Sequence, residues 1–295
     1  MSDTLDSVVT TVCDRLADTH GADAWRFGRR LIAAVLDIDG AVLIAAGDMA
    51  LPSDRVAMVL QAVERAALGE PISRIVGRRG FWDFDLEISA DTLDPRSDTE
   101  TVVEAALCRI PADRPATVAD LGTGSGCLLL AVLAERPLAT GIGIDLSEGA
   151  VHQARRNAVA LDLDRRAKFI VGDWADALCG SFDVVLSNPP YIRTDAMVAL
   201  DEVVRRYDPP SALDGGPDGL QAYRRLMPGT AEILKEGGMA VVEIGFGQAF
   251  SICRIFHDVG LTPIAIRSDL SGIQRAVTAK KCWNSDLSTV RCRRS

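Results

Sequence analysis

The chain has 295 residues, of which 48% are hydrophobic and 25% are charged, and its formal net charge is −9. This composition excludes a disordered protein and indicates a substantial hydrophobic core. For a chain of this length we expect two domains rather than one large domain. The acidic balance argues against broad electrostatic affinity for a nucleic-acid backbone.

The seven cysteines are scattered along the chain, and no two of them form a Cys-x-x-Cys pair. This spacing indicates neither a disulfide framework nor a zinc site, and it fits a reducing cytoplasm. His20, His152 and His257 are isolated from one another and from carboxylate clusters, which indicates surface or core histidines rather than metal ligands. No basic segment precedes an apolar run at the N-terminus, and no stretch reaches about 18 uninterrupted apolar residues. We therefore expect an unexported, cytoplasmic protein with no metal and no membrane span.

Residues 1–75 have the periodicity of helices. Apolar side chains recur at helical spacing in three stretches, namely Leu5, Val8, Val9, Val12 and Leu16, then Phe27, Leu31, Ile32 and Val35, then Val56, Val59, Leu60 and Val63. No residue in this region indicates chemistry. The region is predicted to be a small helical domain that serves either partner recognition or structural support.

Residues 76–95 are predicted to be a β-ribbon that joins two domains. Every second residue of the stretch 82–88 is apolar and the residues between them are acidic, which is typical of a half-buried strand. Gly77 and Gly80 precede this strand and supply the turn residues of a ribbon.

Residues 96–281 are predicted to form an α/β domain with a mostly parallel sheet, because strands and helices alternate from Thr117 onward. Ser97 is predicted to cap the first helix of this domain, over the apolar residues that follow it. The predicted strands cover residues 118–121, 140–145, 168–172, 182–187, 239–244, 262–267 and 274–279. The predicted helices cover residues 126–135, 147–161, 220–235 and 248–258. A long connection after residue 191 is expected to be functional or mobile, and residues 282–295 are expected to be a loose tail.

A glycine-rich turn lies between the first strand and the next helix of this domain. It comprises Gly122, Thr123, Gly124, Ser125 and Gly126. Glycines at such a turn let the backbone bend sharply and approach a ligand closely. The spacing is one residue shorter than the dinucleotide fingerprint, so the turn alone is compatible both with nucleotide-type binding and with a simple tight turn.

Acidic residues end the next two predicted strands. Asp145 lies roughly 20 residues after the glycine turn, where a carboxylate can accept both hydroxyls of a ribose. Asp173 and Trp174 follow the third strand, where the acid can accept an adenine amino group and the indole can pack on the ring. A helix cap or a turn explains Asp173 alone equally well.

The fourth predicted strand ends in the corner Asn188-Pro189-Pro190-Tyr191. Each proline fixes φ, removes a backbone donor and keeps the preceding residue extended. The Asn188 side-chain oxygen and the Pro189 carbonyl can then each accept one N–H of a planar amino group, while Tyr191 packs on its flat face. The alternative is a loop corner whose tyrosine covers the core.

These positions fall at consecutive carboxyl ends of one parallel sheet, where ligands bind in this architecture. Together they describe an adenosine site beside an acceptor site for –NH2. They resemble Rossmann-like S-adenosylmethionine-dependent methyltransferases that act on planar nitrogen, through the segments Leu121-Gly122-Thr123-Gly124-Ser125-Gly126, Gly143-Ile144-Asp145, Gly172-Asp173-Trp174 and Asn188-Pro189-Pro190-Tyr191. Three further segments resemble the HemK/PrmC family, namely Gly80-Phe81-Trp82, Pro95-Arg96-Ser97-Asp98-Thr99-Glu100 and Ala212-Leu213-Asp214-Gly215-Gly216-Pro217-Asp218-Gly219-Leu220.

The resemblance covers about residues 5–280 and implies a Rossmann-like sheet with a small all-helical N-terminal domain. It implies an enzyme that methylates the glutamine amide of the Gly-Gly-Gln motif in peptide chain release factors, using S-adenosylmethionine and leaving S-adenosylhomocysteine. It also implies that the amide enters at the corner 188–191 and that the N-terminal domain helps to hold the release factor. Three features depart from the family: Ser97 replaces a proline, Gly80 replaces a glutamate, and the chain after Lys281 matches no family segment.

Three other functions remain open at this point. A glutamine methyltransferase of a ribosomal protein would carry nearly the same motifs. A DNA adenine-N6 methyltransferase would share the corner, but it would have to flip a base and hold phosphates with a basic segment, and the acidic chain shows no such insert. A cofactor-binding scaffold without activity would not need the intact corner. We expect a monomer that does not bind nucleic acid directly.

Overall fold

The computed structural model describes residues 3–282. The chain divides into two compact units, one made of Met1–Arg78 with Glu202–Tyr207 and the other of Arg79–Asp201 with Asp208–Ser295. No helix within the described residues is long and apolar enough to cross a membrane.

The first unit is all-helical, as its periodicity predicts. Its helices are α1 (Leu5–His20), α2 (Ala24–Leu36), α3 (Gly40–Ala45), α4 (Ser53–Ala67), α5 (Ile72–Val76) and α9 (Glu202–Tyr207), with the short 3-10 helix η1 (Gly21–Asp23). The Thr4 hydroxyl caps α1 by accepting a hydrogen bond from the backbone N–H of Ser7. The buried face of each long helix carries the predicted apolar residues, including Val12, Leu31 and Val59. This unit therefore has a core of its own.

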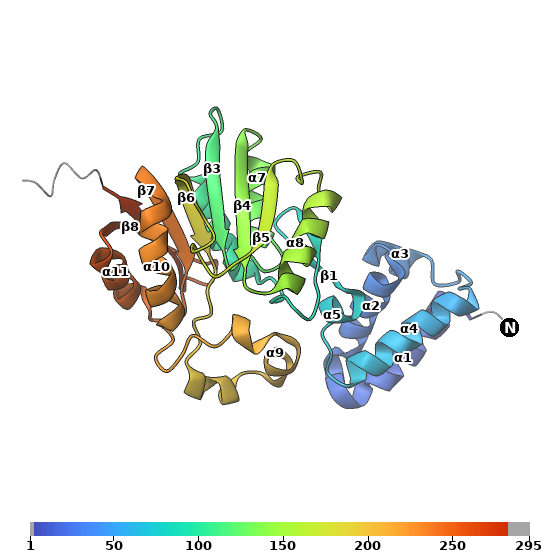
Figure 1. Ribbon diagram of the computed structural model, residues 1–295. Helices are drawn as coiled ribbons and strands as arrows, with labels where there is room; N and C mark the ends of the chain where they lie inside the picture. The colour runs from blue at the N-terminus through green and yellow to red at the C-terminus, as the bar shows by residue number, and fades with distance from the viewer. Residues whose placement is uncertain (1–2, 283–295) are drawn as a thin grey trace, which may run out of the picture. The chain divides into compact units, whose positions relative to one another are not determined.

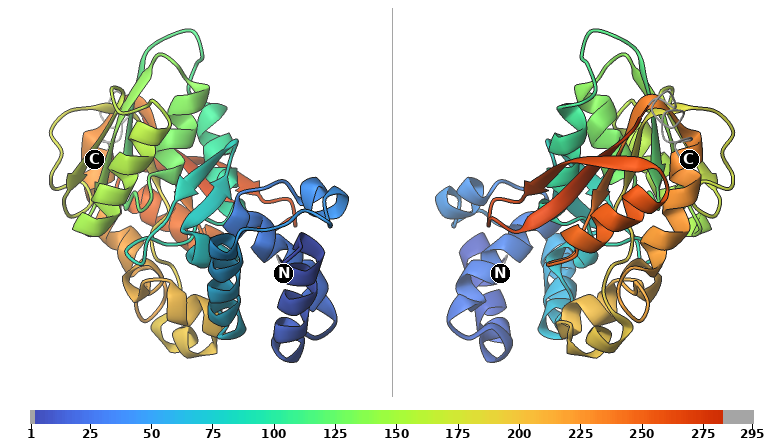
Figure 2. Two further views of the ribbon diagram at one scale, coloured as in Figure 1. Left: turned by 90° about the vertical axis from the view of Figure 1, so that its right-hand side faces the viewer. Right: turned by 90° about the vertical axis from the view of Figure 1, so that its left-hand side faces the viewer.

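The second unit is built on one seven-stranded sheet (Figures 1 and 2). Its strands are β3 (Ala116–Leu121), β4 (Ala139–Asp145), β5 (Ala167–Val171), β6 (Phe182–Ser187), β7 (Leu234–Glu243), β8 (Leu261–Ser268) and β9 (Gln274–Lys281). The order across the sheet is β5-β4-β3-β6-β7-β9-β8. All neighbours from β5 to β7 are parallel, and β9 runs antiparallel to both β7 and β8. This is the predicted mostly parallel sheet of a Rossmann-like fold.

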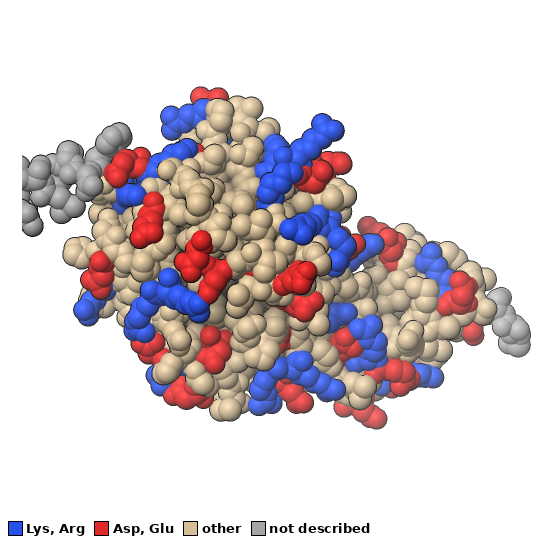
Figure 3. Space-filling model, in the orientation of Figure 1, with Lys and Arg blue, Asp and Glu red and all other residues tan. Residues whose placement is uncertain are grey.

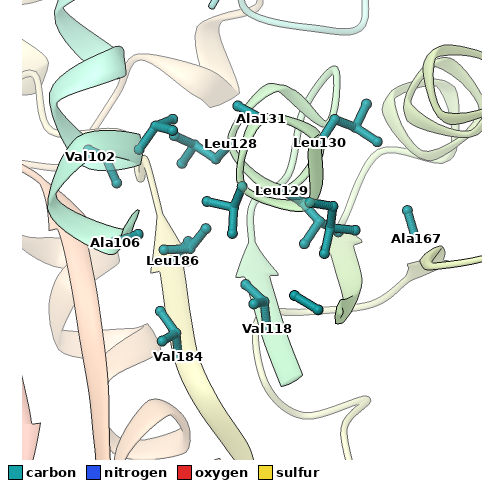
Figure 4. Close-up of a cluster of buried hydrophobic side chains, with 14 of the residues drawn as sticks. Val102, Ala106, Val118, Leu128, Leu129, Leu130, Ala131, Ala167, Val184 and Leu186 are labelled. Atoms are coloured by element: carbon teal, nitrogen blue, oxygen red, sulfur yellow. The ribbon is translucent and has the colours of Figure 1, made fainter. Parts of the chain in front are cut away.

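Helices cover both faces of this sheet. Because strand side chains alternate between faces, Val118 and Val184 belong to one core while Ala119 and Val185 belong to the other. The first core packs under α6 (Glu100–Leu107), α7 (Cys127–Glu135) and α8 (Glu148–Ala160). Figure 4 shows Leu129 on the side of α7 that faces the strands, with Leu128 and Leu130 on the two flanks of the helix. The second core packs under α10 (Gln221–Ile233) and α11 (Ala249–Asp258).

The predicted strand over residues 82–88 is a hairpin instead. Its strands are β1 (Arg78–Phe81) and β2 (Phe84–Glu87), and Trp82 lies in the turn between them with φ 56°. The turn is held from outside, because the backbone N–H of Trp82 donates to Glu100 at 3.0 Å and its indole N–H donates to Glu135 at 2.9 Å. Apolar alternation alone does not reveal such contacts, so the continuous strand was wrong while the ribbon itself is present.

The predicted capping role of Ser97 is also wrong. Ser97 begins the 3-10 helix η2 (Ser97–Thr99), and α6 starts after Thr99, whose side chain makes no capping hydrogen bond. The long connection after Tyr191 contains elements that the periodicity did not predict, η3 (Thr194–Ala199), α9 and η4 (Pro210–Ala212). The predicted loose tail lies, apart from Cys282, outside the described residues.

Candidate active site

The strand register brings the predicted site segments to one edge of the sheet. Leu121 of β3 pairs with Ile144 of β4, and Asp145 pairs with Val171 of β5. On the other side of β3, Asp120 pairs with Leu186 of β6. Because these strands are parallel, the segments that follow each of them emerge at the same edge, where ligands bind in this architecture.

A cavity of about 420 Å³ lies at this edge, within the second unit. Nine of the residues predicted from the sequence line it, namely Gly122, Thr123, Gly124, Ser125, Asp145, Asp173, Trp174, Asn188 and Pro190. Three predicted site residues, Gly126, Pro189 and Tyr191, do not line it. The structure therefore brings the glycine turn, both acids and two residues of the corner, Asn188 and Pro190, together around one cavity.

The glycine turn has the backbone conformation that glycine permits. Gly122 and Gly124 have φ values of 73° and 55°. A Cβ on Gly124 would meet no atom within 4 Å, so this residue leaves open room at the cavity wall, whereas a Cβ on Gly122 would lie 3.3 Å from the Trp174 ring. Gly126 instead allows close packing of the neighbouring helices, because a Cβ added there would lie 3.1 Å from a Leu130 side-chain atom and 3.2 Å from the Ala154 Cβ.

The Asp145 carboxylate is fixed by backbone donors. Oδ2 accepts the N–H of Gly124 at 2.8 Å and Oδ1 accepts the N–H of Ser147 at 2.9 Å. Burial raises the pKa of Asp145, and these hydrogen bonds act in the opposite direction. Each oxygen keeps a second lone pair, so the group can still accept hydroxyl donors from the cavity.

Asp173 and Trp174 line the cavity at the end of β5. The Asp173 carboxylate is engaged by the guanidinium of Arg225 on α10, which also lines the cavity. Trp174 adopts φ 48°, a left-handed conformation that directs the chain sharply after the strand. The structure thus shows an ion pair at Asp173, and its predicted contact with an adenine amino group stays a prediction.

The corner at the end of β6 is held from several sides. The Ser187 hydroxyl donates to the carbonyl of Leu121 at 2.6 Å, which ties the strand end to the glycine turn. The Asn188 amide nitrogen donates to the Thr99 hydroxyl at 3.3 Å. The Tyr191 hydroxyl donates to the Glu243 carboxylate at 3.2 Å, and burial raises the Tyr191 pKa well above its ordinary value. Tyr191 is therefore neutral and acts as a donor at physiological pH.

The long connection after Tyr191 folds back and packs against the corner 188–191. Ile192 donates to the carbonyl of Leu213 at 3.0 Å, and Gly215 donates back to Ile192 at 2.7 Å. Gly215 lies so close that a Cβ would approach the Pro190 carbonyl and the Tyr191 Cα to 2.8 Å. Only glycine fits there without displacing the corner.

Four residues that contact the site received no site role from the sequence, namely Thr99, Arg225, Glu243 and Gln248, and the side-chain amide of Gln248 donates to the Tyr191 carbonyl at 3.1 Å. Glu243 gave a usable signal, because it ends an apolar strand as Asp145 does, in the run Val241-Val242-Glu243. Arg225 gave none, since its partner Asp173 is 52 residues away. Within residues 3–282 no group of three or more His, Cys, Asp and Glu side chains is arranged to hold a metal ion.

Two family models match the chain. The Methyltransferase small domain matches residues 96–206, which contain the glycine turn, both acids and the corner. The PrmC N-terminal domain matches residues 8–77, in the helical unit. Among solved structures, a methyltransferase from Pyrococcus furiosus aligns with 79% of this chain and all of its own, at 17% identity and a TM-score of 0.49.

Relatives named release factor glutamine methyltransferase match nearly the whole chain. The protein from Rhodospirillum rubrum is 49% identical over 88% of this chain and 80% of its own. That from Caulobacter vibrioides is 42% identical over 95% of this chain and 98% of its own, and that from Bradyrhizobium diazoefficiens is 42% identical over 94% and 95%. This degree of identity, over both units, shows that the chain belongs to the release factor glutamine methyltransferase family.

Proposed function

We propose that this enzyme methylates the side-chain amide nitrogen of the glutamine in the Gly-Gly-Gln motif of peptide chain release factors. The observation that carries the proposal is the position of the corner 188–191. Asn188 and Pro190 line the same cavity as the glycine turn and Asp145, so an amide acceptor can lie beside a bound adenosine-type cofactor. The name shared by the relatives supports the same acceptor.

The cofactor is S-adenosylmethionine, and the residues present fit it. Gly124 leaves open the space that a Cβ would take, and the Asp145 carboxylate is a fixed acceptor suited to ribose hydroxyls. Trp174 offers an indole at the cavity wall for the adenine ring. We infer that these residues and the backbone of the glycine turn hold the cofactor. When bound, S-adenosylmethionine supplies an activated methyl group.

The acceptor amide is a poor nucleophile because its lone pair is delocalised into the carbonyl. We infer that the Asn188 side-chain oxygen and the Pro189 carbonyl each accept one of its N–H groups. No backbone N–H within residues 3–282 donates to the Pro189 carbonyl, which is consistent with this role. Two acceptors on a stiff corner orient the nitrogen and raise its electron density, so most of the rate comes from positioning. The released proton passes to water.

The surface charge supports a protein acceptor over DNA. On the face shown in Figure 3, basic and acidic side chains are interspersed, and the whole chain carries a net charge of −9. A DNA methyltransferase needs cations gathered along the phosphate path. We place the enzyme in the cytoplasm, where release factors act, and propose that it works as a monomer.

One assay tests the proposal. Labelled S-adenosylmethionine is incubated with the enzyme and, in separate reactions, a release factor, ribosomal proteins and DNA, and the labelled residue is mapped by mass spectrometry. We expect label on the Gly-Gly-Gln glutamine alone. Label on a ribosomal protein or on adenine would replace the proposed acceptor, and full turnover by Asn188→Ala would contradict the proposed use of the corner.

A further inference from the structure

Two segments that belong to no strand of the sheet form part of the wall of the cofactor cavity. Pro95 and Thr99 line it from the segment that precedes α6, and Pro209, Ser211 and Ala212 line it from the long connection. All of these residues belong to the second unit. The cavity is therefore bounded partly by strand ends and partly by two loop segments.

The piece of the long connection over residues 208–215, called the strap below, is fixed at the end that meets the corner. The Leu213 carbonyl accepts the N–H of Ile192 at 3.0 Å, and Gly215 donates to the Ile192 carbonyl at 2.7 Å. Leu213 and Gly215 are both buried. This end of the strap is thus held by backbone hydrogen bonds inside the protein.

The other end of the strap is held by the side chain of Asp208, which is buried. Its Oδ1 accepts the backbone N–H of Asp94 at 3.1 Å, and its Oδ2 accepts from the Arg96 guanidinium at 2.5 Å. The segment that supplies these donors is itself fixed, because Arg79 donates to the Pro95 carbonyl at 3.0 Å and lies 3.4 Å from the Asp94 carboxylate. Asp208 therefore joins the two loop segments that line the cavity.

The two ends of the strap differ in how readily they can open. The end at Ile192 consists of backbone pairing between buried residues, whereas the Arg96 side chain at the Asp208 end is 42% exposed. Pro209 and Pro210 follow Asp208, and they fix φ and keep the preceding residues extended. The strap is consequently stiff next to Asp208, and once Asp208 is released it swings as one piece about the end at Ile192.

We propose that the contact of Asp208 with Arg96 and Asp94 is a latch that opens to let S-adenosylmethionine enter and S-adenosylhomocysteine leave. Apart from the two loop segments, the residues that line the cavity lie at the ends of parallel strands or in α7 and α10, which pack on the two hydrophobic cores. The joint between the loop segments is thus the part of the wall that can separate without breaking a core. This inference rests on the cofactor site proposed above, and it adds a role for Asp208, which none of the site motifs contains.

A latch that opens for passage in both directions has a kinetic signature. Weakening it lowers the barrier to entry and the barrier to exit together, so the association and dissociation rate constants both rise while their ratio, the Kd, changes little. A contact that merely supports the bound cofactor would affect dissociation alone and would raise the Kd. Measuring both rate constants separates these two roles.

The test measures S-adenosylmethionine binding to the full-length enzyme by stopped-flow tryptophan fluorescence, since Trp174 lines the cavity. The observed rate plotted against cofactor concentration gives association from its slope and dissociation from its intercept, and calorimetry gives the Kd independently. Arg96→Gln removes the charged donor. We expect both rate constants to rise about tenfold, the lower end of the range for a hydrogen bond to a charged group because Arg96 is half-buried, and the Kd to stay within about threefold.

Three further variants test the contact itself. Arg96→Lys keeps the positive charge and should behave as the wild type. Asp208→Asn keeps an oxygen for the Asp94 N–H but places an amide N–H against the guanidinium, so it should match Arg96→Gln, and the double variant should be no faster than either single variant. Arg267→Gln is the matched control, because Arg267 is a half-buried arginine that donates to Glu104 at 2.9 Å and does not line the cavity.

Wild-type rate constants in Arg96→Gln would overturn the inference, and so would faster dissociation with unchanged association. Arg96→Gln decides this by itself if the variant at the buried Asp208 fails to fold. The measurement uses no acceptor, so its result is independent of whether the methylated residue is the Gly-Gly-Gln glutamine. An unchanged Kd in Asp145→Ala would instead show that the proposed cofactor site is wrong.

Discussion

The side-chain amide of Gln248 donates a hydrogen bond of 3.1 Å to the carbonyl oxygen of Tyr191, at the end of the corner. The same amide nitrogen donates to the Gly219 carbonyl at 3.1 Å, and the amide oxygen accepts the N–H of Gly245 at 2.9 Å. One side chain thus links the segments that follow β6 and β7 to the end of the long connection. The position of the corner depends on this link as well as on its own prolines.

Replacing Gln248 should therefore affect turnover more than cofactor binding. Gln248→Ala removes three hydrogen bonds of about 1 kcal/mol each, and we expect kcat to fall about tenfold or more. Gln248→Glu is the more specific test of the two donated hydrogen bonds, because it keeps the acceptor for Gly245 but places a carboxylate oxygen against the Tyr191 and Gly219 carbonyls. Its kcat should therefore be lower than that of the alanine variant. Steady-state kinetics with release factor measures both, and Gln274→Ala, at an exposed glutamine of β9, is the control. Equal kcat in all four proteins would show that the link is dispensable.

Gly215 tests the close approach of the long connection. In Gly215→Ala the new methyl group would lie 2.8 Å from the Pro190 carbonyl, so either the corner or the loop must move. Overpacking of this kind costs about 1–3 kcal/mol, and we expect both a lower midpoint of urea unfolding and a lower kcat. Gly40→Ala is the matched control, since a Cβ there meets nothing within 4 Å. A Gly215 variant as stable and active as the control would mean that the loop yields without moving the corner.

Replacing Asp145 should weaken cofactor binding more than it lowers turnover. Asp145→Ala removes the acceptors proposed for the ribose and frees the backbone N–H groups of Gly124 and Ser147. We expect the Kd for S-adenosylmethionine to rise about 10- to 100-fold, the range for lost hydrogen bonds to a charged group, with a smaller effect on kcat at saturation. Calorimetry measures it against Asp258→Ala, an exposed acid at the end of α11. An unchanged Kd would remove Asp145 from the cofactor site.

The sequence predicts the parts of this site that are local in the chain. Asp145 and Asn188 each end an apolar strand, and parallel strands place their ends at one edge, so their proximity follows from periodicity and topology. Thr99 could not be found in this way, because it lies 89 residues from Asn188 and its turn reads as an ordinary helix start. Contacts between segments far apart in the chain depend on packing that a hydrophobic pattern does not contain.

The same limit explains the differences in the fold. The sheet and its covering helices follow from strong, long patterns, and six of the seven strands agree with the predicted ranges within two residues at each end, whereas β7 begins at Leu234, five residues before the predicted start. The turn at Trp82 is held by hydrogen bonds to Glu100 and Glu135, which are distant in sequence. It therefore forms although the alternating apolar residues around it predict a continuous strand. The short helix α9 has only six residues, too few for a hydrophobic pattern to predict a helix, and it lies in a connection whose composition indicates a loop.

A buried acid beneath the glycine turn makes the stability of the enzyme depend on pH. Asp120 is buried, and burial raises its pKa to about 7, although the Thr123 hydroxyl acts against this shift. The unfolded chain releases the same proton near its ordinary value of 3.8. Between these values the folded state binds more protons than the unfolded state, so the free energy of unfolding falls as pH rises, and it levels off above pH 7.

Asp120→Asn should remove this part of the pH dependence, because asparagine does not titrate. We expect the free energy of unfolding of the wild type to fall between pH 5 and 8 relative to the variant, by at most about 1.4 kcal/mol per pH unit. Urea unfolding of the cofactor-free proteins at pH 5, 6, 7 and 8 measures the difference at each pH, and taking the difference cancels the other titrating groups. The free energy of unfolding of the wild type minus that of the variant should thus decrease as pH rises. A gap that stays constant across these four pH values would mean that Asp120 is already ionised in the folded protein, with its charge stabilised from beneath the glycine turn.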